Sequence, residues 1–137
     1  MKRVLMFALV AAFLTSPAMA ISHFKKVWGE HYTPSGDDPG ADKVDPEFRS
    51  ATRKAGCFIC HVKGEDKKEV RNEYGNAMHD LLDAENYDRD RIKAEPEKVQ
   101  KEIIEAFEKV AKMKSKDGKT FGEKLQAGEL PATDAGL

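Results

Sequence analysis

The sequence predicts a small all-α domain. Three segments, 21–33, 70–84 and 96–114, repeat their apolar residues with the period of an amphipathic helix, and nothing reads as a pair of alternating strands. The connecting segments are rich in proline, glycine and charged residues, which is typical of loops. We therefore expect a single domain of four to five short helices.

Residues 1–20 have the pattern of a secretory signal peptide. A positively charged start is followed by an apolar run that ends at Leu14 and by an Ala-x-Ala cleavage site that ends at Ala20. The apolar run is too short to cross a bilayer, which takes roughly 20 residues. We expect cleavage after Ala20, release into the periplasm without a stable membrane anchor, and a mature domain of residues 21–137.

The charge pattern narrows the choice of partners. Removal of the leader, which contains Lys2 and Arg3 but no acidic residue, changes the formal charge from -1 to -3. Charged residues of both signs make up 34% of the chain, so neither nucleic acid nor an anionic membrane is expected as a partner. Apolar residues make up 40% of the chain, and this fraction includes the leader, so few apolar side chains remain for the core of the mature domain. An apolar prosthetic group would help to fill this thin core. A thin core also leaves dimerisation open.

The first half of the mature chain contains two predicted helices. The segment 21–33 carries one apolar face, formed by Phe24, Val27, Trp28 and Tyr32. The segment 33–44 contains two prolines, two glycines and three aspartates and is expected to be a loop. Asp45 as N-cap and Pro46 at the first helical position then begin a helix that runs into the cysteine motif.

The second half is also helical. The apolar face of 70–84 is formed by Tyr74, Met78, Leu81 and Leu82, and the charged segment 86–93 has room for one helical turn. The longest helix is expected at 96–114, with a buried face formed by Val99, Ile103, Ile104, Phe107, Val110 and Ala111. A capping box from Thr120 to Glu123 begins a last short helix, and the tail from Pro131 is expected to fray.

The chemistry of the chain lies in the five residues Cys57-Phe58-Ile59-Cys60-His61. This Cys-x-x-Cys-His spacing is the signature of covalent haem c attachment. Two sulfurs three residues apart lie on the same side of one helical turn, so both can reach the two vinyl groups along one porphyrin edge. His61 would bind the iron through Nε2, while its Nδ1-H donates to a backbone carbonyl that fixes the ring. We therefore expect one haem c with His61 as the proximal iron ligand.

Three other uses of the cysteines fit less well. A thioredoxin-like redox pair would follow a strand in a βαβ unit, but helices surround this motif. A zinc site needs four ligands, and the neighbours Cys60 and His61 cannot easily both turn to one tetrahedral metal. A disulfide between Cys57 and Cys60 would close a loop too short to stabilise the fold much.

On the residues Cys57 to His61 the chain resembles small monohaem cytochromes c, and its short helical layout is similar to the class I group. Cys-x-x-Cys-His-Val-Lys-Gly followed by Arg-Asn-Glu-Tyr-Gly at 71–75 also resembles small monohaem cytochromes of planctomycete bacteria. Relatives of those proteins include a haem pair that has cysteine as its distal ligand and binds nitric oxide. This chain departs from that pair because no third cysteine remains for the role.

The distal iron ligand decides between electron transfer and gas binding. The resemblance to class I cytochromes implies a methionine downstream of the motif and before the last helix, and Met113 meets this description. Met78 is expected to fill the core and His79 to lie at the surface. His23, His31 and an open distal site are further alternatives.

Basic residues also follow the motif. A solvated loop is the favoured interpretation of this segment, because interleaved acidic residues nearly cancel the basic charge. A ring of basic residues around the haem edge that steers an acidic redox partner is the alternative. One of these residues, or the polar tip of Trp28 or Tyr74, would pair with a haem propionate. The basic residues are Lys63, Lys67, Lys68 and Arg71.

The sequence therefore predicts a periplasmic electron-transfer protein that exchanges single electrons with larger redox proteins. No nucleophile and base pair, phosphate loop or metal cluster stands beside the motif, so an enzyme is not expected. The alternatives are a gas-binding or sensing haem protein and a haem subunit of a larger redox complex.

Overall fold

The computed structural model describes residues 18–67 and 69–137. Within this part the chain forms six α-helices, three short 3₁₀ turns and no strand, which confirms the all-α prediction with one helix more than expected. The helices are α1 (Ala18–Tyr32), α2 (Pro46–Ala55), α3 (Glu73–His79), α4 (Arg89–Ala94), α5 (Pro96–Ala111) and α6 (Phe121–Gln126), and the turns are η1 (Ala41–Lys43), η2 (Gly56–Ile59) and η3 (Ala84–Asn86).

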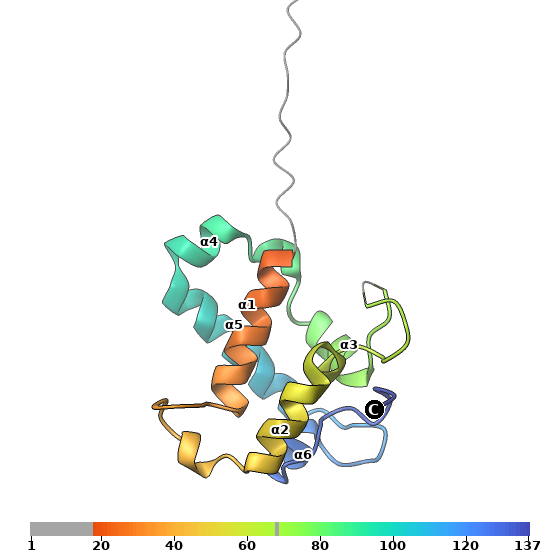
Figure 1. Cartoon of the computed structure of the whole chain (residues 1–137). Coiled ribbons are helices and arrows are strands. Elements are labelled where there is room, and N and C mark those ends of the chain that lie inside the picture. The colour runs from red at the N-terminus through yellow and green to blue at the C-terminus, as the bar shows by residue number, and fades with distance from the viewer. Residues whose placement is uncertain (1–17, 68) are drawn as a thin grey trace, which may run out of the picture.

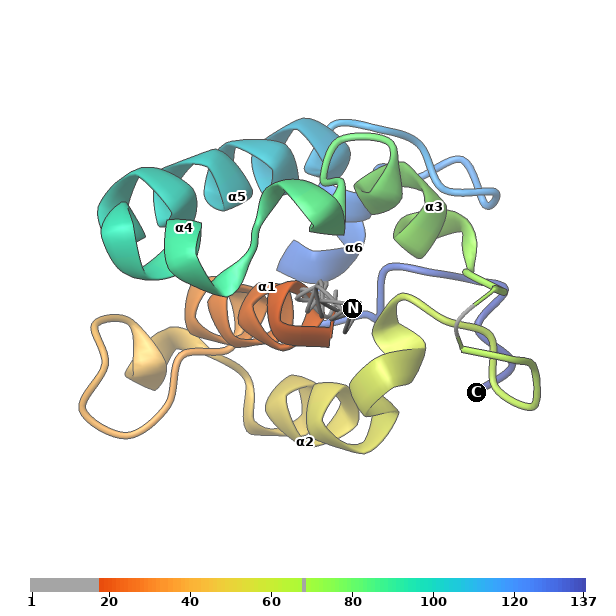
Figure 2. The same ribbon diagram turned by 90° about the horizontal axis from the view of Figure 1, so that it is seen from above.

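The two longest helices, α1 and α5, pack against each other, and α6 and α3 pack against α5 (Figure 1). Seen from above, α1 and α6 lie between α5 on one side and α2 on the other (Figure 2). The cysteine motif follows α2 directly, so it lies where this outer helix returns to the body of the domain.

The core forms where the apolar faces of these helices meet. Val99, Ile103, Phe107 and Val110 of α5 are fully buried, as expected, and Val27 and Trp28 of α1 pack against the same cluster. Aromatic pairs join the helices: the Tyr32 and Phe107 rings lie 6.0 Å apart and the Tyr74 and Phe121 rings 5.1 Å apart. Such pairs add to the stabilisation that burial of apolar area gives.

The predicted starts of α2 and α6 are confirmed by their caps. The Asp45 carboxylate accepts hydrogen bonds from the backbone N–H groups of Glu47 and Phe48, and Pro46 occupies the first helical position. Thr120 and Glu123 form the expected capping box at α6. These local bonds satisfy N–H groups that have no partner within a helix.

The helix expected at 70–84 is shorter than predicted. Asn72 caps α3, and the backbone before it is held in an isolated antiparallel bridge between His61 and Arg71, so 70–72 cannot be helical. After His79 the chain turns, which leaves Leu81 43% exposed rather than on the buried face.

The C-terminal tail is packed, and the prediction that it frays is wrong. Pro131 and Ala135 are buried, and the Lys63 N–H donates to the Ala135 carbonyl at 2.8 Å. The Glu73 N–H donates to the Asp134 carboxylate at 2.9 Å. The tail therefore lies against the loop that follows the cysteine motif and against the start of α3.

The predicted leader lies outside the described residues except for its last three, with which α1 begins. Ala20, after which cleavage is expected, is buried. None of the helices in the described part is both long and apolar enough to cross a membrane.

Candidate functional site

The cysteine motif begins where α2 ends. Gly56 has φ of 55°, a left-handed conformation that glycine adopts without strain, and its N–H donates to the Thr52 carbonyl. The chain then continues as the 3₁₀ turn η2 and not as the α-helical turn that the spacing suggested. Residues i and i+3 are eclipsed in a 3₁₀ turn, so Cys57 and Cys60 still share one side.

The two thiols have different environments. Cys57 is exposed and Cys60 is partly buried. Burial, assisted by the neighbouring Cys57, raises the pKa of the Cys60 thiol to about 12 against the opposing effect of Arg71. Cys60 is therefore a neutral thiol at physiological pH when no group is attached to it.

The His61 ring is held as the haem interpretation requires. Its Nδ1 lies 3.1 Å from the Val70 carbonyl oxygen, which is the expected contact with a backbone carbonyl. Among the described residues this is the one side-chain hydrogen bond of His61. Donation from Nδ1 fixes the tautomer in which Nε2 carries a lone pair for a metal.

Asn72 fastens the motif to α3. Its side-chain Nδ2 donates to the carbonyls of Phe58 and Ile59 at 3.1 and 3.0 Å and contacts that of His61 at 3.3 Å. Its Oδ1 accepts from the Gly75 N–H at 2.8 Å. The side chain is completely buried, so losing it would leave several polar groups without partners, at about 1–3 kcal/mol each.

Gly75 and Tyr74 complete this attachment. A Cβ atom on Gly75 would lie 1.9 Å from the Cys60 carbonyl oxygen, so only glycine lets α3 approach the motif this closely. Tyr74 is fully buried, and its hydroxyl accepts a hydrogen bond from Trp28 Nε1 at 2.9 Å. The sequence predicts the burial of Tyr74, but only the structure shows that Asn72 and Gly75 hold the motif.

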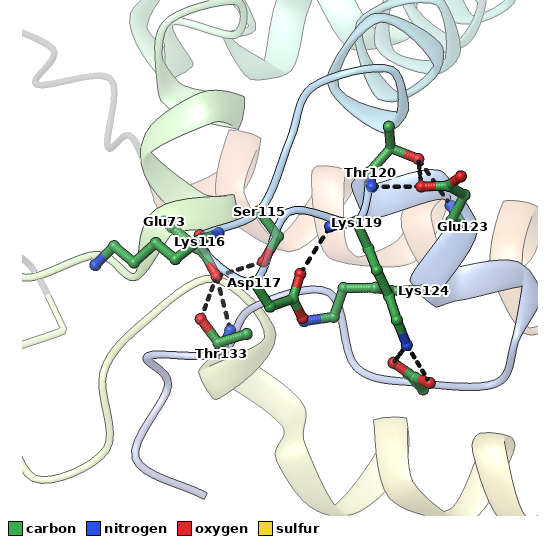
Figure 3. A network of polar contacts seen from close by, with 10 residues as sticks. Glu73, Ser115, Lys116, Asp117, Lys119, Thr120, Glu123, Lys124 and Thr133 are labelled. Atoms are coloured by element: carbon green, nitrogen blue, oxygen red, sulfur yellow. Dashed lines mark hydrogen bonds and ion pairs between the residues drawn. The ribbon is translucent and has the colours of Figure 1, made fainter.

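Glu73 joins the motif region to two further segments. Its carboxylate accepts hydrogen bonds from the Ser115 hydroxyl, the Lys116 N–H, and both the N–H and the hydroxyl of Thr133 (Figure 3). Burial opposes ionisation of Glu73, but these hydrogen bonds together outweigh it and lower the pKa of the carboxyl. The ionised carboxylate therefore holds the C-terminal tail and the turn after α5 against α3.

We expect this arrangement to weaken in acid. A carboxyl whose pKa is lowered by folding stabilises the fold above its unfolded-state pKa, and this contribution is lost as the pH falls through the lowered value. Glu73→Gln should lower the thermal midpoint at pH 7, with a difference from the wild type that shrinks at a second, acidic pH, because protonation of the wild-type carboxyl removes its contribution as the pH falls through the lowered pKa. Glu105→Gln, at an exposed ion pair on α5, is the control. A difference that is equal at both pH values would contradict this role of Glu73.

One cavity adjoins the motif. It has a volume of about 460 Å³ and lies between α1, the loop 33–38 and α2. Ile59, inside the motif, lines it together with Trp28, whose indole N–H contacts Tyr74. This cavity could not be predicted from the sequence, because it forms only where α1, the loop 33–38 and α2 meet.

The candidate distal ligands are scattered. Met113 follows the end of α5 and its side chain is 43% exposed, whereas Met78 is buried in the core and His79 is exposed. His31 is exposed and contacts the Tyr32 ring edge to face, with ring centres 4.6 Å apart. His23 is partly buried, and its Nε2 has no hydrogen-bond partner among the described residues. Neither a methionine nor a histidine is among the described residues that line the cavity.

The basic residues after the motif are also spread out. Lys63 and Lys67 are exposed, and the Lys67 ammonium lies 4.9 Å from the centre of the Phe58 ring. Arg71 is half-buried beside His61, to which its backbone is bridged. Lys68 lies outside the described residues.

These residues fit a covalent haem better than a protein-bound metal ion. Within the described residues, no group of three or more histidine, cysteine, aspartate and glutamate side chains could hold a metal. A haem needs no such group, because the porphyrin nitrogens bind the iron and the protein supplies only axial ligands. The paired cysteines and the oriented His61 are the groups that would hold a covalent haem, but none of the three is among the residues that line the cavity at Ile59.

Comparison of the chain with protein-family models, with curated proteins and with solved structures gives no match.

Proposed function

We propose that this protein carries one haem c, bound covalently through Cys57 and Cys60, with His61 as the proximal iron ligand, and that it transfers electrons in the periplasm. The observation that carries the proposal is the contact of 3.1 Å between His61 Nδ1 and the Val70 carbonyl, within a Cys-x-x-Cys-His motif. This contact leaves Nε2 as the metal-binding nitrogen of a ring that is already oriented. The leader of residues 1–20 supports export.

The haem, when bound, supplies an iron that accepts and releases single electrons. The chain holds the group and keeps its surroundings fixed. Asn72 binds the carbonyls of the motif, and Gly75 packs directly against Cys60. A site whose protein geometry changes little on oxidation or reduction favours rapid electron exchange with larger redox proteins.

The proposal is tested on the mature protein, produced in a host that attaches haem c. We expect a mass equal to residues 21–137 plus one haem that resists denaturation, and a reduced spectrum that carbon monoxide leaves unchanged. A mature chain without haem, or with only a disulfide between Cys57 and Cys60, would overturn the proposal.

A gas-binding haem protein is the second candidate, and one observation favours it. Met113, the methionine predicted as the distal ligand, is 43% exposed and is not packed into the core. An iron without a protein ligand on its distal side would bind carbon monoxide or nitric oxide. A Soret shift of the reduced wild type under carbon monoxide would select this candidate.

Met113→Ala tests the distal ligand of the electron carrier. A thioether ligand raises the reduction potential, so we expect the variant to have a lower potential than the wild type and an altered reduced spectrum. His79→Ala, at an exposed position of α3, is the matched control and should leave both unchanged. If Met113→Ala is indistinguishable from the wild type, Met113 is not the ligand.

A further inference from the structure

The cavity between α1, the loop 33–38 and α2 has the size of a ligand site. Its volume of about 460 Å³ lies within the range of small-molecule pockets, roughly 300–1,000 Å³. The buried side chains of Trp28, Pro34 and Ile59 form the apolar part of its lining. Neither the two cysteines of the motif nor His61 lines it, so its occupant would be a molecule other than the proposed haem.

Gly29 leaves the α1 wall of this cavity open. It lies inside α1, where glycine is less favourable than alanine. Neither the backbone nor the packing calls for glycine, because its φ is not positive and a Cβ atom built on it meets nothing within 4 Å. A helical glycine beside open space is explained when another group must approach the backbone closely.

The charges around the cavity favour an anionic ligand, because four basic residues line it against two acidic ones. Both acidic side chains are engaged within the protein. Glu30 pairs with Lys26 at 3.7 Å, and Asp38 accepts a hydrogen bond from a backbone N–H of its own loop at 3.4 Å. Neither Lys25 nor Arg53 forms an ion pair with another described residue, so two cations at the cavity have no counter-charge. The basic residues of the lining are Lys25, Lys26, Arg49 and Arg53.

Two guanidinium groups lie on one face of α2. Arg49 and Arg53 are four residues apart, and like charges at this spacing disfavour a helix. The Arg49 Nη2 donates to the carbonyls of Pro34 and Ala41 at 2.9 and 2.6 Å, which fixes this side chain in place. Its Nε is buried and has no hydrogen-bond partner in the described structure. An anion between the two arginines would offset their repulsion, and a carboxylate matches the fork of a guanidinium.

We propose that this cavity binds a small organic acid, with its apolar body against Trp28 and Ile59 and its carboxylate at Arg49 and Arg53. The basic residues select an anion, and the apolar lining selects one with a hydrophobic body over an inorganic ion. The inference goes beyond the proposed function and does not depend on it, because none of the haem-attachment residues lines the cavity. Since Ile59 stands between the two cysteines, the bound acid also contacts the motif.

The first test uses Trp28 as a reporter. It is the one tryptophan of the chain, so the protein has a single indole N–H resonance, and this group lies at the cavity. Benzoate, titrated into the mature protein, should shift this resonance in a saturable way. Benzyl alcohol has the same body without the charge, and inorganic phosphate has the charge without the body, so both should bind more weakly. No saturable shift with benzoate, or equal affinity for either of the other two probes, would overturn the inference.

The second test removes one cation. Arg53→Gln should weaken benzoate binding roughly tenfold, which is the effect of losing one hydrogen bond to a charged group. Arg53 is exposed and forms no ion pair within the described structure, so its loss should leave the thermal midpoint unchanged. Lys101→Gln makes the same charge change at an exposed ion pair on α5 and should leave the affinity unchanged. Equal weakening in the two variants would mean that benzoate responds only to net charge, and the inference would be wrong.

The third test fills the cavity. Gly29→Leu projects a side chain into open space, so the chain should keep its helical circular dichroism and a thermal midpoint no lower than that of the wild type. We expect it to lose benzoate binding. Gln100→Leu, at a second hollow on α5, is the matched control and should bind benzoate like the wild type. A Gly29→Leu protein that binds benzoate with wild-type affinity would contradict the site. None of these results depends on haem content, so a failure here is distinguishable from a failure of the proposed function.

Discussion

Gly75→Ala is expected to destabilise the protein by about 3 kcal/mol, which is the upper part of the range for overpacking a closely packed interior. The added Cβ would lie 1.9 Å from the carbonyl oxygen of Cys60 and 2.8 Å from its carbonyl carbon. Both are backbone atoms, so no side chain can rotate away to make room. Either α3 or the cysteine motif must move, and the hydrogen bonds of Asn72 that join them would be strained.

The measurement is urea unfolding of Gly75→Ala beside Gly29→Ala. Both glycines lie in helices, but a Cβ atom on Gly29 meets nothing within 4 Å. Gly29→Ala should therefore raise the free energy of unfolding by roughly 0.5–1 kcal/mol, through helix propensity alone. If the two variants are equally stable, the close approach of α3 to the motif is not present in solution.

Replacement of both cysteines, Cys57→Ser with Cys60→Ser, is expected to abolish covalent haem attachment. Each thioether bond needs its own sulfur, and a serine hydroxyl does not replace a thiol in this reaction. Each single variant should keep one bond and show a lower yield of loaded protein. Serine is close to cysteine in size, so the helical circular dichroism of the double variant should stay near that of the unloaded wild-type chain.

The readout is haem that remains on the chain after denaturation and acid extraction. Cys57 is exposed and Cys60 is partly buried, so the two single variants should differ: a hydroxyl at position 60 is partly removed from water and needs a hydrogen-bond partner within the protein. Cys60→Ser should therefore be the less stable of the two single variants. Full covalent loading of the double variant would show that other residues attach the group, and the proposed function would be wrong.

Much of the secondary structure could be predicted because its signals are local. Asp45 with Pro46, and Thr120 with Glu123, begin α2 and α6 as expected, since a cap satisfies N–H groups within its own first turn. The apolar residues of α5 likewise recur in consecutive turns of one helix, so this segment alone predicts its apolar face. These features need no knowledge of the rest of the fold.

The predictions that are wrong concern segments that contact distant parts of the chain. Helical periodicity predicts a helix from residue 70, but the bridge between His61 and Arg71, which periodicity does not show, moves the start of α3 to Glu73. The tail was expected to fray because its small residues carry no periodic signal, yet Glu73, 60 positions before Thr133, holds it in place. In both cases contacts between remote parts of the chain overrode the local pattern.

For the candidate site, the sequence by itself determined the attachment chemistry that we propose for Cys57, Cys60 and His61, because that chemistry depends on residue type and spacing within five positions. Only the tertiary structure decided what surrounds them: Val70 behind the His61 ring, Asn72 and Gly75 against the motif, and an open cavity over Gly29. The physical reason is that hydrogen-bond partners, close backbone contacts and cavities belong to surfaces built from several elements, and no single segment of sequence encodes them.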